Sequence, residues 1–455
     1  MPASSPSFDT APDGEAGADP AGREPVDSSY RALLRIPTLP RILVAMQLAR
    51  IAQSMVGVAI VLFTLQEYGS PQLAGIVTFA ATFPGLLVSP IAGALLDRHG
   101  RTRLILLDYA MELVALTLMG GLALARALPA PLLILIAIGA AFTSILSHTG
   151  LRSLFPLLVP KHLWERVNAV DSNGYVIATI VGPPLAAGLV AVFGGAVALI
   201  VIAGAFGVAA VAMIGVPDPP SETVSTGNLL LDAWHGVVYW WRNLTLRGLG
   251  FSITVLNLAF GMMTISLPLM VLDVLHAGEL AVGLVFGLSG LSGMVSALYF
   301  GRVDSRGREW RMLVLPMLVM APAYLLMLPV AAGVTGVILG FALLGLSSLV
   351  IGFLNGPMDI ALFTVRQRRT DPAWMGRAFA VSMAANFMGF PFGAAIGGAL
   401  AAISLPVSVI VGGALILAGA ALATTMIPRA DPGPSPTPGP GPSPGMDQPE
   451  GESAG

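Results

Sequence analysis

The stretch GALLDRHGRTRL, residues 93–104, places a cluster of ionisable side chains between two long apolar segments. The segment LAGIVTFAATFPGLLVSPIAGALL leads into it, and LILLDYAMELVALTLMGGLALA follows it. A helix needs about 20 apolar residues to cross the hydrocarbon core of a bilayer, and each segment is that long. The stretch therefore predicts a short polar connection between two membrane-spanning helices.

The composition of the whole chain agrees with this prediction. Of its 455 residues, 55% are hydrophobic and only 11% are charged, whereas a soluble domain carries about 25% charged residues. The net charge of −2 gives no basis for nucleic-acid binding. The chain has no cysteine, and its five histidines show no metal-binding spacing, so we expect neither a metal nor a cofactor.

Hydropathy predicts twelve membrane-spanning segments. They cover residues 40–67, 72–96, 103–126, 130–157, 168–192, 195–216, 246–272, 279–301, 311–331, 334–362, 375–402 and 405–427. Twenty of the 23 Lys and Arg residues then fall on one side of the membrane, and only Arg126 falls on the other. Lys and Arg are retained on the cytoplasmic side during insertion, so we expect an inner-membrane (plasma-membrane) protein with both termini in the cytoplasm.

The regions outside the spans define the expected domains. We predict a disordered N-terminal tail (1–35), an N-terminal bundle of six helices (36–216), a cytoplasmic linker (217–245), a C-terminal bundle of six helices (246–428) and a disordered Pro/Gly-rich tail (429–455). The second part of the linker predicts an amphipathic helix in the membrane interface, with Trp240 and Trp241 at headgroup depth. The alternative is a short continuation of the seventh span.

The two halves of the chain repeat each other. DRHGR at 97–101 recurs as DSRGR at 304–308, an offset of 207 residues. ERVNAV at 165–170 matches GRAFAV at 376–381, an offset of 211 residues. Duplicated halves of six helices are typical of transporters with two bundles around a central cavity. We therefore expect an all-α membrane protein with twelve transmembrane helices in two pseudo-symmetric six-helix bundles.

These residues carry a resemblance to a known family. The first charged stretch resembles the signature of the loop between the second and third helices of the major facilitator superfamily, and DSRGR resembles its weaker copy. The matching residues are Gly93, Asp97, Arg98, Gly100, Arg101, Asp304, Gly307 and Arg308. LRSLFPLLVPKHLWERVNAVDS (151–172) and TIVGPPLAAG (179–188) resemble the drug-efflux and siderophore-exporter branch that contains the enterobactin exporter and macrolide efflux pumps. The likeness extends from about residue 35 to 428.

In such a carrier the two bundles rock against each other, and the loop forms a cytoplasmic gate that closes and opens. Asp97 can accept from helix N-terminal amides and from an arginine. Gly93 and Gly100 allow close helix approach and a tight turn, and Arg98 and Arg101 can pair across the bundles. The alternative is that the loop only sets the orientation of the chain.

The fifth span contains a proline pair that resembles the exporter motif of this superfamily. Pro183 and Pro184 remove two backbone donors and are expected to bend the helix. Gly182 and Gly188 are expected to give a flat face for the opposite bundle, and GFPFGAAIGG (389–398) is the related feature in the eleventh span. The alternative is ordinary close packing of small residues.

Ionisable residues within the spans are costly and therefore mark candidate functional sites. Asp108 and Glu112 are four residues apart on one helix face, at a depth similar to that of Arg50. We hypothesise that Arg50 pairs with Glu112 or Asp108, and that one carboxylate takes a proton during transport. The alternative is a static buried pair that fixes helix packing.

Further polar residues extend the candidate sites. Arg152 and Asp171 are expected to form a gate or structural pair, and Asp359, beside Asn355, is expected to face the cavity. His148 is expected to be a hydrogen-bonded packing histidine rather than a substrate contact. Additional cavity contacts are predicted at Asn173, Asn257 and Asn386.

The chain has no nucleotide-binding pattern, so an ion or substrate gradient must drive transport. We expect a proton-coupled exporter of small amphipathic or hydrophobic compounds that works by alternating access. It would be a monomer surrounded by lipid and would not be an enzyme. The alternatives are a dedicated exporter of a siderophore or another secondary metabolite, a lysolipid carrier, a transport-inactive receptor or an intramembrane enzyme.

Overall fold

A computed structural model describes residues 29–218, 229–303, 305, 307–371 and 374–429, and within these ranges the chain is helical and has no strand. The first half contains α1 (Tyr30–Leu34), α2 (Leu39–Tyr68), α3 (Pro71–His99), α4 (Arg101–Leu124), α5 (Ala130–Ala141), α6 (Ser144–Leu158), the 3₁₀ helix η1 (Lys161–Leu163), α7 (Trp164–Phe193) and α8 (Gly195–Met213). The second half contains α9 (Leu229–Arg242), α10 (Leu244–Leu269), the π-helix η2 (Met270–Val274), α11 (Glu279–Phe300), α12 (Glu309–Leu325), α13 (Leu328–Ala331), α14 (Val337–Arg368), α15 (Met375–Ile403) and α16 (Leu405–Met426).

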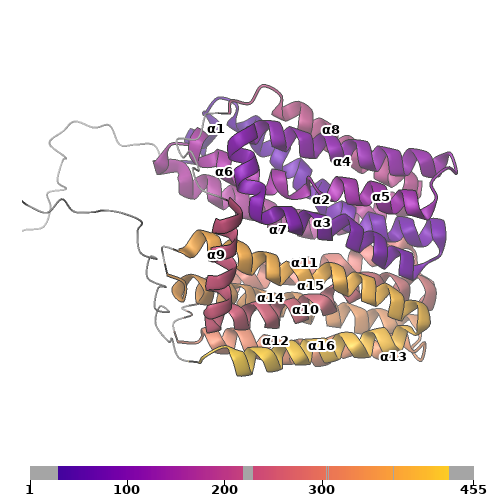
Figure 1. The fold of residues 1–455 in the computed structure, drawn as a ribbon. Helices are drawn as coiled ribbons and strands as arrows, with labels where there is room; N and C mark the ends of the chain where they lie inside the picture. Colours follow the sequence, from indigo (N-terminus) through magenta and orange to yellow (C-terminus); the bar gives the residue numbers. More distant parts are fainter. Residues whose placement is uncertain (1–28, 219–228, 304, 306, 372–373, 430–455) are drawn as a thin grey trace, which may run out of the picture.

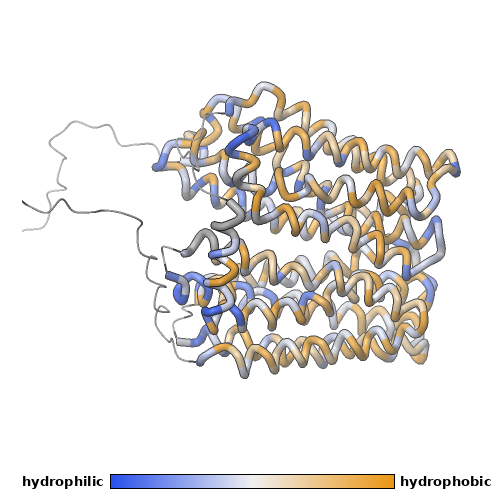
Figure 2. The backbone as a smooth tube through the Cα atoms, viewed as in Figure 1, coloured by the Kyte–Doolittle hydropathy of each residue, from blue (hydrophilic) through white to orange (hydrophobic). Residues whose placement is uncertain are grey.

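Twelve helical segments of the described chain are long and apolar enough to cross a membrane, which confirms the predicted number. Four of these segments join consecutive helices: α5 with α6 (Ala130–Leu158), η1 with α7 (Lys161–Phe193), α10 with η2 (Leu244–Val274) and α12 with α13 (Glu309–Ala331). Hydrophobic residues run along the lengths of the helices, and hydrophilic residues gather at their ends (Figure 2).

The helices form two bundles that lie side by side (Figure 1). Within the first, α2 packs on α7 and α8, and α4 packs on α8 and α6. Within the second, α10 packs on α15 and α16, and α11 packs on α14. The main contacts between the bundles join α3 to α15 and α7 to α11. We call the end that carries α9, the start of α1 and the end of α16 the terminal end, and the opposite end the far end (Figure 1).

Local capping fixes the far-end turn between α2 and α3. Gly69 ends α2 in the left-handed conformation with φ +58°, which glycine adopts without a Cβ penalty. The hydroxyl of Ser70 accepts a hydrogen bond from the Leu73 amide at 3.1 Å, and Pro71 takes the first helical position. The sequence GSP therefore encodes the reversal of the chain.

Helix α9 crosses the terminal end, roughly perpendicular to the long helices (Figure 1). It is a separate helix rather than a continuation of α10, because Asn243 intervenes and caps α10 by accepting from the Leu246 amide at 3.0 Å. The two tryptophans of α9 differ in exposure, and their depth in the membrane interface stays a prediction. Trp240 is only 8% exposed and packs over Gly250, whereas Trp241 is 54% exposed.

Candidate functional site

The two bundles are in close contact toward the far end. A Cβ atom built on Gly75 of α3 would lie 3.1 Å from Cα of Gly398 in α15. Gln66, at the end of α2, donates a hydrogen bond from Nε2 to Oε1 of Glu279 in α11 at 2.5 Å. Both contacts join one half of the chain to the other, so the structure holds the bundles together at this end.

The proline pair of α7 lies where α7 packs against α11, the second main contact between the bundles. α7 continues as an α-helix through Pro183 and Pro184, and Pro184 packs against α11, where a Cβ on Gly283 would lie 2.9 Å from Cα of Pro184. Proline at 183 cannot donate to the carbonyl of Thr179, and that oxygen would lie 3.1 Å from a Cβ on Gly290. The glycines that allow α7 to pack closely, Gly283 and Gly290, therefore belong to α11.

The predicted flat face on α7 is corrected in one respect. Gly182 packs within its own bundle, because a Cβ there would lie 2.6 Å from Cβ of Ser54 in α2. Gly188 does face the opposite bundle, with Leu280 of α11 at 3.9 Å from its Cβ position. Successive helix residues point about 100° apart, so two small residues six positions apart serve different neighbours.

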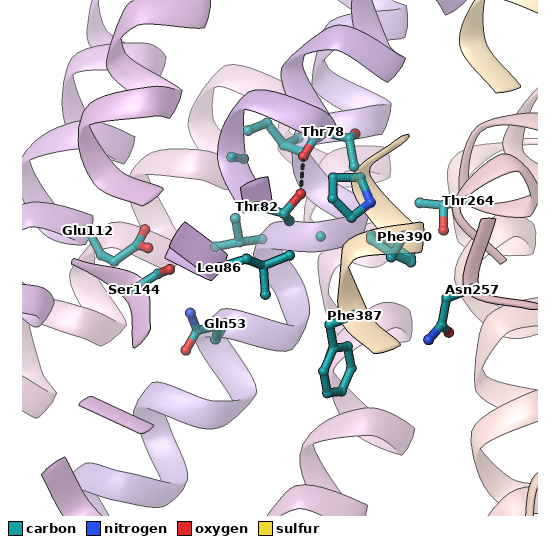
Figure 3. A pocket seen from close by; sticks show the side chains of 15 residues that line it. Gln53, Thr78, Thr82, Leu86, Glu112, Ser144, Asn257, Thr264, Phe387 and Phe390 are labelled. Carbon is teal, nitrogen blue, oxygen red and sulfur yellow. Dashed lines mark hydrogen bonds between the residues drawn. The ribbon is translucent and has the colours of Figure 1, made fainter. Parts of the chain in front are cut away.

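A cavity of about 410 Å³ lies between the bundles, which we call the α3–α15 cavity (Figure 3). Its walls come from α2, α3, α4 and the start of α6 on one side, and from α10 and α15 on the other. Glu112 and Asn257 lie on opposite sides of it (Figure 3). Most of the remaining lining is apolar, with Phe387 and Phe390 on the α15 side.

Two more cavities form a chain with it, in which the α10–α14 cavity lies between the other two. The α7–α11 cavity of about 430 Å³ is closed on one side by α14, and the α10–α14 cavity of about 320 Å³ lies within the second bundle. Asn355 and Asp359 of α14 line both of these cavities. Asn257 and Phe387 line both the α10–α14 and the α3–α15 cavities. Because neighbouring cavities share walls, we treat the three as one central cavity.

The predicted cavity residues fall into two groups. Glu112, Asn355, Asp359 and Asn386 line the central cavity, as does Asn257. The remaining predicted residues are not among its lining residues: Arg50, Asp108 and Asn173. Asp108 is buried behind the wall, near the side chains of Thr143 and Ser147, and Asn173 is exposed outside it.

Arg50 pairs with Asp171 of α7, not with Glu112 or Asp108 as hypothesised. Its guanidinium donates to Oδ1 of Asp171 at 2.5 Å and to the Asp171 carbonyl at 2.7 Å, and lies 3.8 Å from the ring centroid of Tyr175. The reason is packing: α2 runs along α7, whereas the carboxylates of α4 face α6 and the cavity. Depth along the spans matched Arg50 with the carboxylates of α4, but depth could not show which helix α2 packs against.

Other predicted residues complete this cluster. Nε of Arg152 lies 3.4 Å from Oδ2 of Asp171, so the predicted pair of Arg152 and Asp171 is present but shares its carboxylate with Arg50. Nδ1 of His148 lies 3.0 Å from the hydroxyl of Tyr175. The histidine is thus hydrogen-bonded inside the first bundle. Its partner Tyr175 lines the α7–α11 cavity, whereas His148 does not.

The charged loop between α3 and α4 is organised by a residue that the sequence analysis missed. Asp218, which follows α8, accepts a hydrogen bond through Oδ2 from the Thr102 amide at 3.1 Å and so caps the N-terminus of α4. Gly100 has φ +91°, and a Cβ there would lie 2.6 Å from this same Oδ2. The signal available in the sequence was an acidic residue directly after the sixth span, next to a helix start that lacks its own capping side chain.

The charged residues of this loop pair locally. Asp97 accepts from Arg101 at 2.5 Å, one helical turn away, and Arg101 is buried. Arg98 is exposed, and among the described residues neither arginine forms an ion pair with the other bundle. Gly93 lies in α3, but its surroundings are outside the description.

In the weaker copy of this loop, Gly307 has φ +72° and Arg308 is exposed. Asp304 lies outside the described residues.

The repeat predicted from the sequence is visible in equivalent contacts. Nε2 of Gln47 in α2 donates to the carbonyl of Gly174 in α7 at 3.3 Å. Adding the offsets, 47 + 207 = 254 and 174 + 211 = 385, and Thr254 of α10 donates to the carbonyl of Ala385 in α15 at 2.7 Å. An equivalent side-chain to carbonyl hydrogen bond thus joins the first and fifth spans of each half.

The sequence as a whole matches a known family. The family model described as Major Facilitator Superfamily matches residues 42–387. The chain belongs to the Major Facilitator Superfamily. Within it, the chain is 37% identical over 405 residues to the uncharacterized MFS-type transporter y4rN of Sinorhizobium fredii, which covers 88% of this chain and 97% of that protein. It is 25% identical over 357 residues to the multidrug efflux pump Tap of Mycobacterium tuberculosis, covering 76% of this chain and 83% of the pump.

Solved structures show the same superfamily fold. A bacterial homologue of the iron transporter ferroportin in its inward-facing state superposes with a TM-score of 0.65 at 18% identity, over 86% of this chain and 98% of that chain. The nucleoside transporter NupG gives 0.68 at 11% identity, over 86% and 99%. At these identities the likeness is one of fold. The protein is a multi-pass membrane transporter and not an enzyme.

Proposed function

We propose that this transporter exports small amphipathic or hydrophobic compounds in exchange for protons, by alternating access, and that it belongs to the drug-efflux and siderophore-exporter branch. The multidrug efflux pump Tap supports the direction of transport. The central cavity supports the class of substrate, because apolar and aromatic side chains dominate its lining. The bundles are joined at the far end, so substrate would enter from the terminal end.

The observation that carries the proposal is the position of Glu112. Its side chain lines the α3–α15 cavity (Figure 3), and it forms no ion pair with the described residues. Asp108 lies one turn earlier on the same helix, buried behind the wall. A carboxylate at a cavity that opens alternately to each side can take up a proton on one side and release it on the other.

The charged loop would act as the gate in the opposite state. Closing the terminal end brings α3 toward the start of α15, and Arg98 is exposed and available for a contact with the other bundle. In the state described, with the bundles joined at the far end, Asp97 and Arg101 form an ion pair with each other. Gly307 and Arg308 would act equivalently in the second half.

The orientation follows from the distribution of basic residues. The loops of the terminal end carry most of the Lys and Arg residues, so we place this end and both chain termini in the cytoplasm of a cell whose plasma membrane holds the protein. We expect a monomer, because the cavity is complete within one chain.

The test is transport in proteoliposomes under an imposed pH gradient, with a panel of amphipathic dyes as substrates. We expect dye accumulation that follows the gradient, and its loss in Glu112→Gln and Asp108→Asn. Asp273→Asn, which changes an exposed carboxylate at the far end, is the matched control and should transport normally. Dye transport that ignores the pH gradient would refute proton coupling, and rejection of every dye would favour a dedicated siderophore, metabolite or lysolipid carrier.

A further inference from the structure

A separate groove of about 310 Å³ lies between the end of α11, the first three turns of α12 and the middle of α14, and we call it the α12–α14 groove. None of the residues that line it lines the central cavity. On α14, Leu354 and Pro357 line the groove. Asn355 and Asp359, which line the cavity, point about 150° away from them around the helix. Helix α14 therefore separates the groove from the central cavity.

The groove opens toward the lipid. Helix α12 lies along an edge of the second bundle (Figure 1), and its main packing partners, α14 and α16, belong to the same bundle. Leu315 and Val319 of α12 line the groove and are 53% and 49% exposed. Both residues lie within the membrane-spanning segment Glu309–Ala331, so the surface that they expose contacts the hydrocarbon of the bilayer.

The length of the groove matches one leaflet of a bilayer. Its lining on α12 begins at Arg308 and extends to Val319, which at the rise of a helix is about 16 Å. The hydrocarbon core of a bilayer is about 30 Å thick, so each leaflet contributes about 15 Å of it. An acyl chain that lies along the groove from the terminal end therefore stays within a single leaflet.

Positive charge is confined to the terminal end of this groove. Arg308 and Arg311 are exposed, three residues apart, and are the charged residues of the lining, whose other members are all apolar. Neither arginine forms an ion pair with a residue in the described part of the chain. The acidic residue between them, Glu309, pairs with Arg368 of α14. Two guanidinium groups are thus left to contact an anion, and phosphate is the group whose geometry they match.

We propose that the α12–α14 groove binds one anionic phospholipid, whose phosphate contacts Arg308 and Arg311 and one of whose acyl chains lies along Leu315 and Val319. A soluble anion would use the arginines alone, and a zwitterionic lipid would bring a cationic group beside them. The proposed orientation places these arginines at the cytoplasmic leaflet, which carries the anionic lipids. The lipid is a resident of the bilayer and not the transported compound, because α14 separates it from the central cavity.

The experiment measures the affinity of the first lipid bound to the purified full-length protein by native mass spectrometry. Dioleoylphosphatidylglycerol is the anionic probe, and dioleoylphosphatidylcholine is the zwitterionic probe with the same acyl chains. We expect the anionic lipid to bind at least about fivefold more tightly, and Arg311→Gln to lower its affinity about fivefold, as expected for one basic residue at a membrane surface. Arg103→Gln is the matched control and should change nothing. Arg103 is also exposed and is the third residue of α4, as Arg311 is of α12.

A second pair of variants tests the acyl chain. Leu315→Trp fills the groove and should lower the affinity for the anionic lipid about fivefold. Leu318→Trp should leave it unchanged, because Leu318 is 42% exposed on the same helix but does not line the groove. Arg311 and Leu315 are exposed, so their variants should fold normally.

Three results would overturn the proposal. The first is equal affinity for the two lipids, and the second is unchanged affinity for the anionic lipid in both Arg311→Gln and Leu315→Trp. The third is a loss of affinity in Arg311→Gln alone, which would replace the lipid by a soluble anion bound at the arginines. Neither substrate nor proton gradient enters the measurement, so its outcome is independent of the proposed function.

Discussion

At the scale of single residues, the strongest electrostatic constraint is the ion pair between Arg50 and Asp171. The two side chains are 3% and 7% exposed, so removing one partner leaves the other charge buried. We expect Asp171→Asn to lower the free energy of unfolding by about 3 kcal/mol or more. Denaturation of the purified protein in detergent measures this change.

Two controls show whether the cost comes from the orphaned charge. The double variant Arg50→Met with Asp171→Leu removes both charges and should regain most of the stability. Glu309→Gln breaks the pair with Arg368 and leaves behind an arginine side chain that is 43% exposed, so it should cost only about 1 kcal/mol or less. A double variant as unstable as Asp171→Asn would contradict this account.

The same pair shows what the sequence could and could not predict at this scale. The predicted spans contained the acidic residues that line the cavity, and Asn355 and Asp359 of α14 lie in its lining. Arg366 was missed, because the tenth span was predicted to end at residue 362, whereas α14 continues to Arg368 and Arg366 is fully buried. The partner of Arg50 was predicted wrongly because hydropathy gives the depth of a residue and not the direction in which its helix face points. Choosing Asp171 required knowing that α2 packs along α7, which is a property of the bundle rather than of either helix.

The cap on α4 leads to a prediction about coupled residues. Gly100→Ala introduces a Cβ in a left-handed conformation and against Oδ2 of Asp218, so two penalties add, together about 2 kcal/mol or more. In an Asp218→Ala background the clash disappears and only the conformational strain remains. A double-mutant cycle on thermal stability should therefore show coupling between the two positions.

Gly333→Ala serves as the reference for this cycle. That glycine also has positive φ, +67°, but nothing lies within 4 Å of its Cβ position. It should show the strain alone and no coupling to Asp218. Additive effects of Gly100→Ala and Asp218→Ala would show that a Cβ at residue 100 does not clash with Asp218.

At the scale of helices, the crossing of α7 and α11 depends on missing side chains. A Cβ on Gly283 would lie 2.5 Å from Cβ of Ala187 and 2.9 Å from Cα of Pro184, so Gly283→Ala must push the bundles apart at the far end. We expect a shift toward the state that is open at this end, measured as increased labelling of a single cysteine introduced at Gln66. Gly121→Ala, in a helix but with open space at its Cβ position, should leave labelling unchanged.

Helix α9 provides a matched pair of neighbouring tryptophans. Trp240 is buried over Gly250 and Trp241 is mostly exposed. We expect Trp240→Ala to destabilise the protein by about 3 kcal/mol, the usual cost of emptying a buried aromatic site, and Trp241→Ala to cost much less. Equal melting temperatures for the two variants would mean that α9 is not packed on the second bundle as described.

The helices also show why the sequence predicted elements better than their contacts. Length and apolarity were sufficient for the twelve spans, because a helix in lipid must satisfy its own backbone. The small residues of α7 were identified, but the sequence could not assign them to the same bundle or to the other. That assignment depends on how α2, α7 and α11 are rotated about their axes, as the different neighbours of Gly182 and Gly188 show.

At the scale of the whole molecule, alternating access requires the far-end contacts to break and re-form in each cycle. The chain has no native cysteine, so paired cysteines can test this directly. Gln66 and Glu279 join the bundles at that end. Linking Gln66→Cys with Glu279→Cys by a short cleavable bifunctional thiol reagent should abolish transport but leave ligand binding from the terminal end, and cleavage of the link should restore transport.

The control places a link inside one bundle. The hydroxyls of Ser266 and Ser408 lie 2.8 Å apart within the second bundle, so a Ser266→Cys, Ser408→Cys disulfide joins residues that should move together. Each bundle moves as a rigid body in this mechanism, and transport should therefore continue with that bond formed. Undiminished transport in the Gln66–Glu279 linked protein would mean that the halves do not separate at the far end. Substrate would then have to leave the cavity by a route other than the one between α3, α15, α7 and α11.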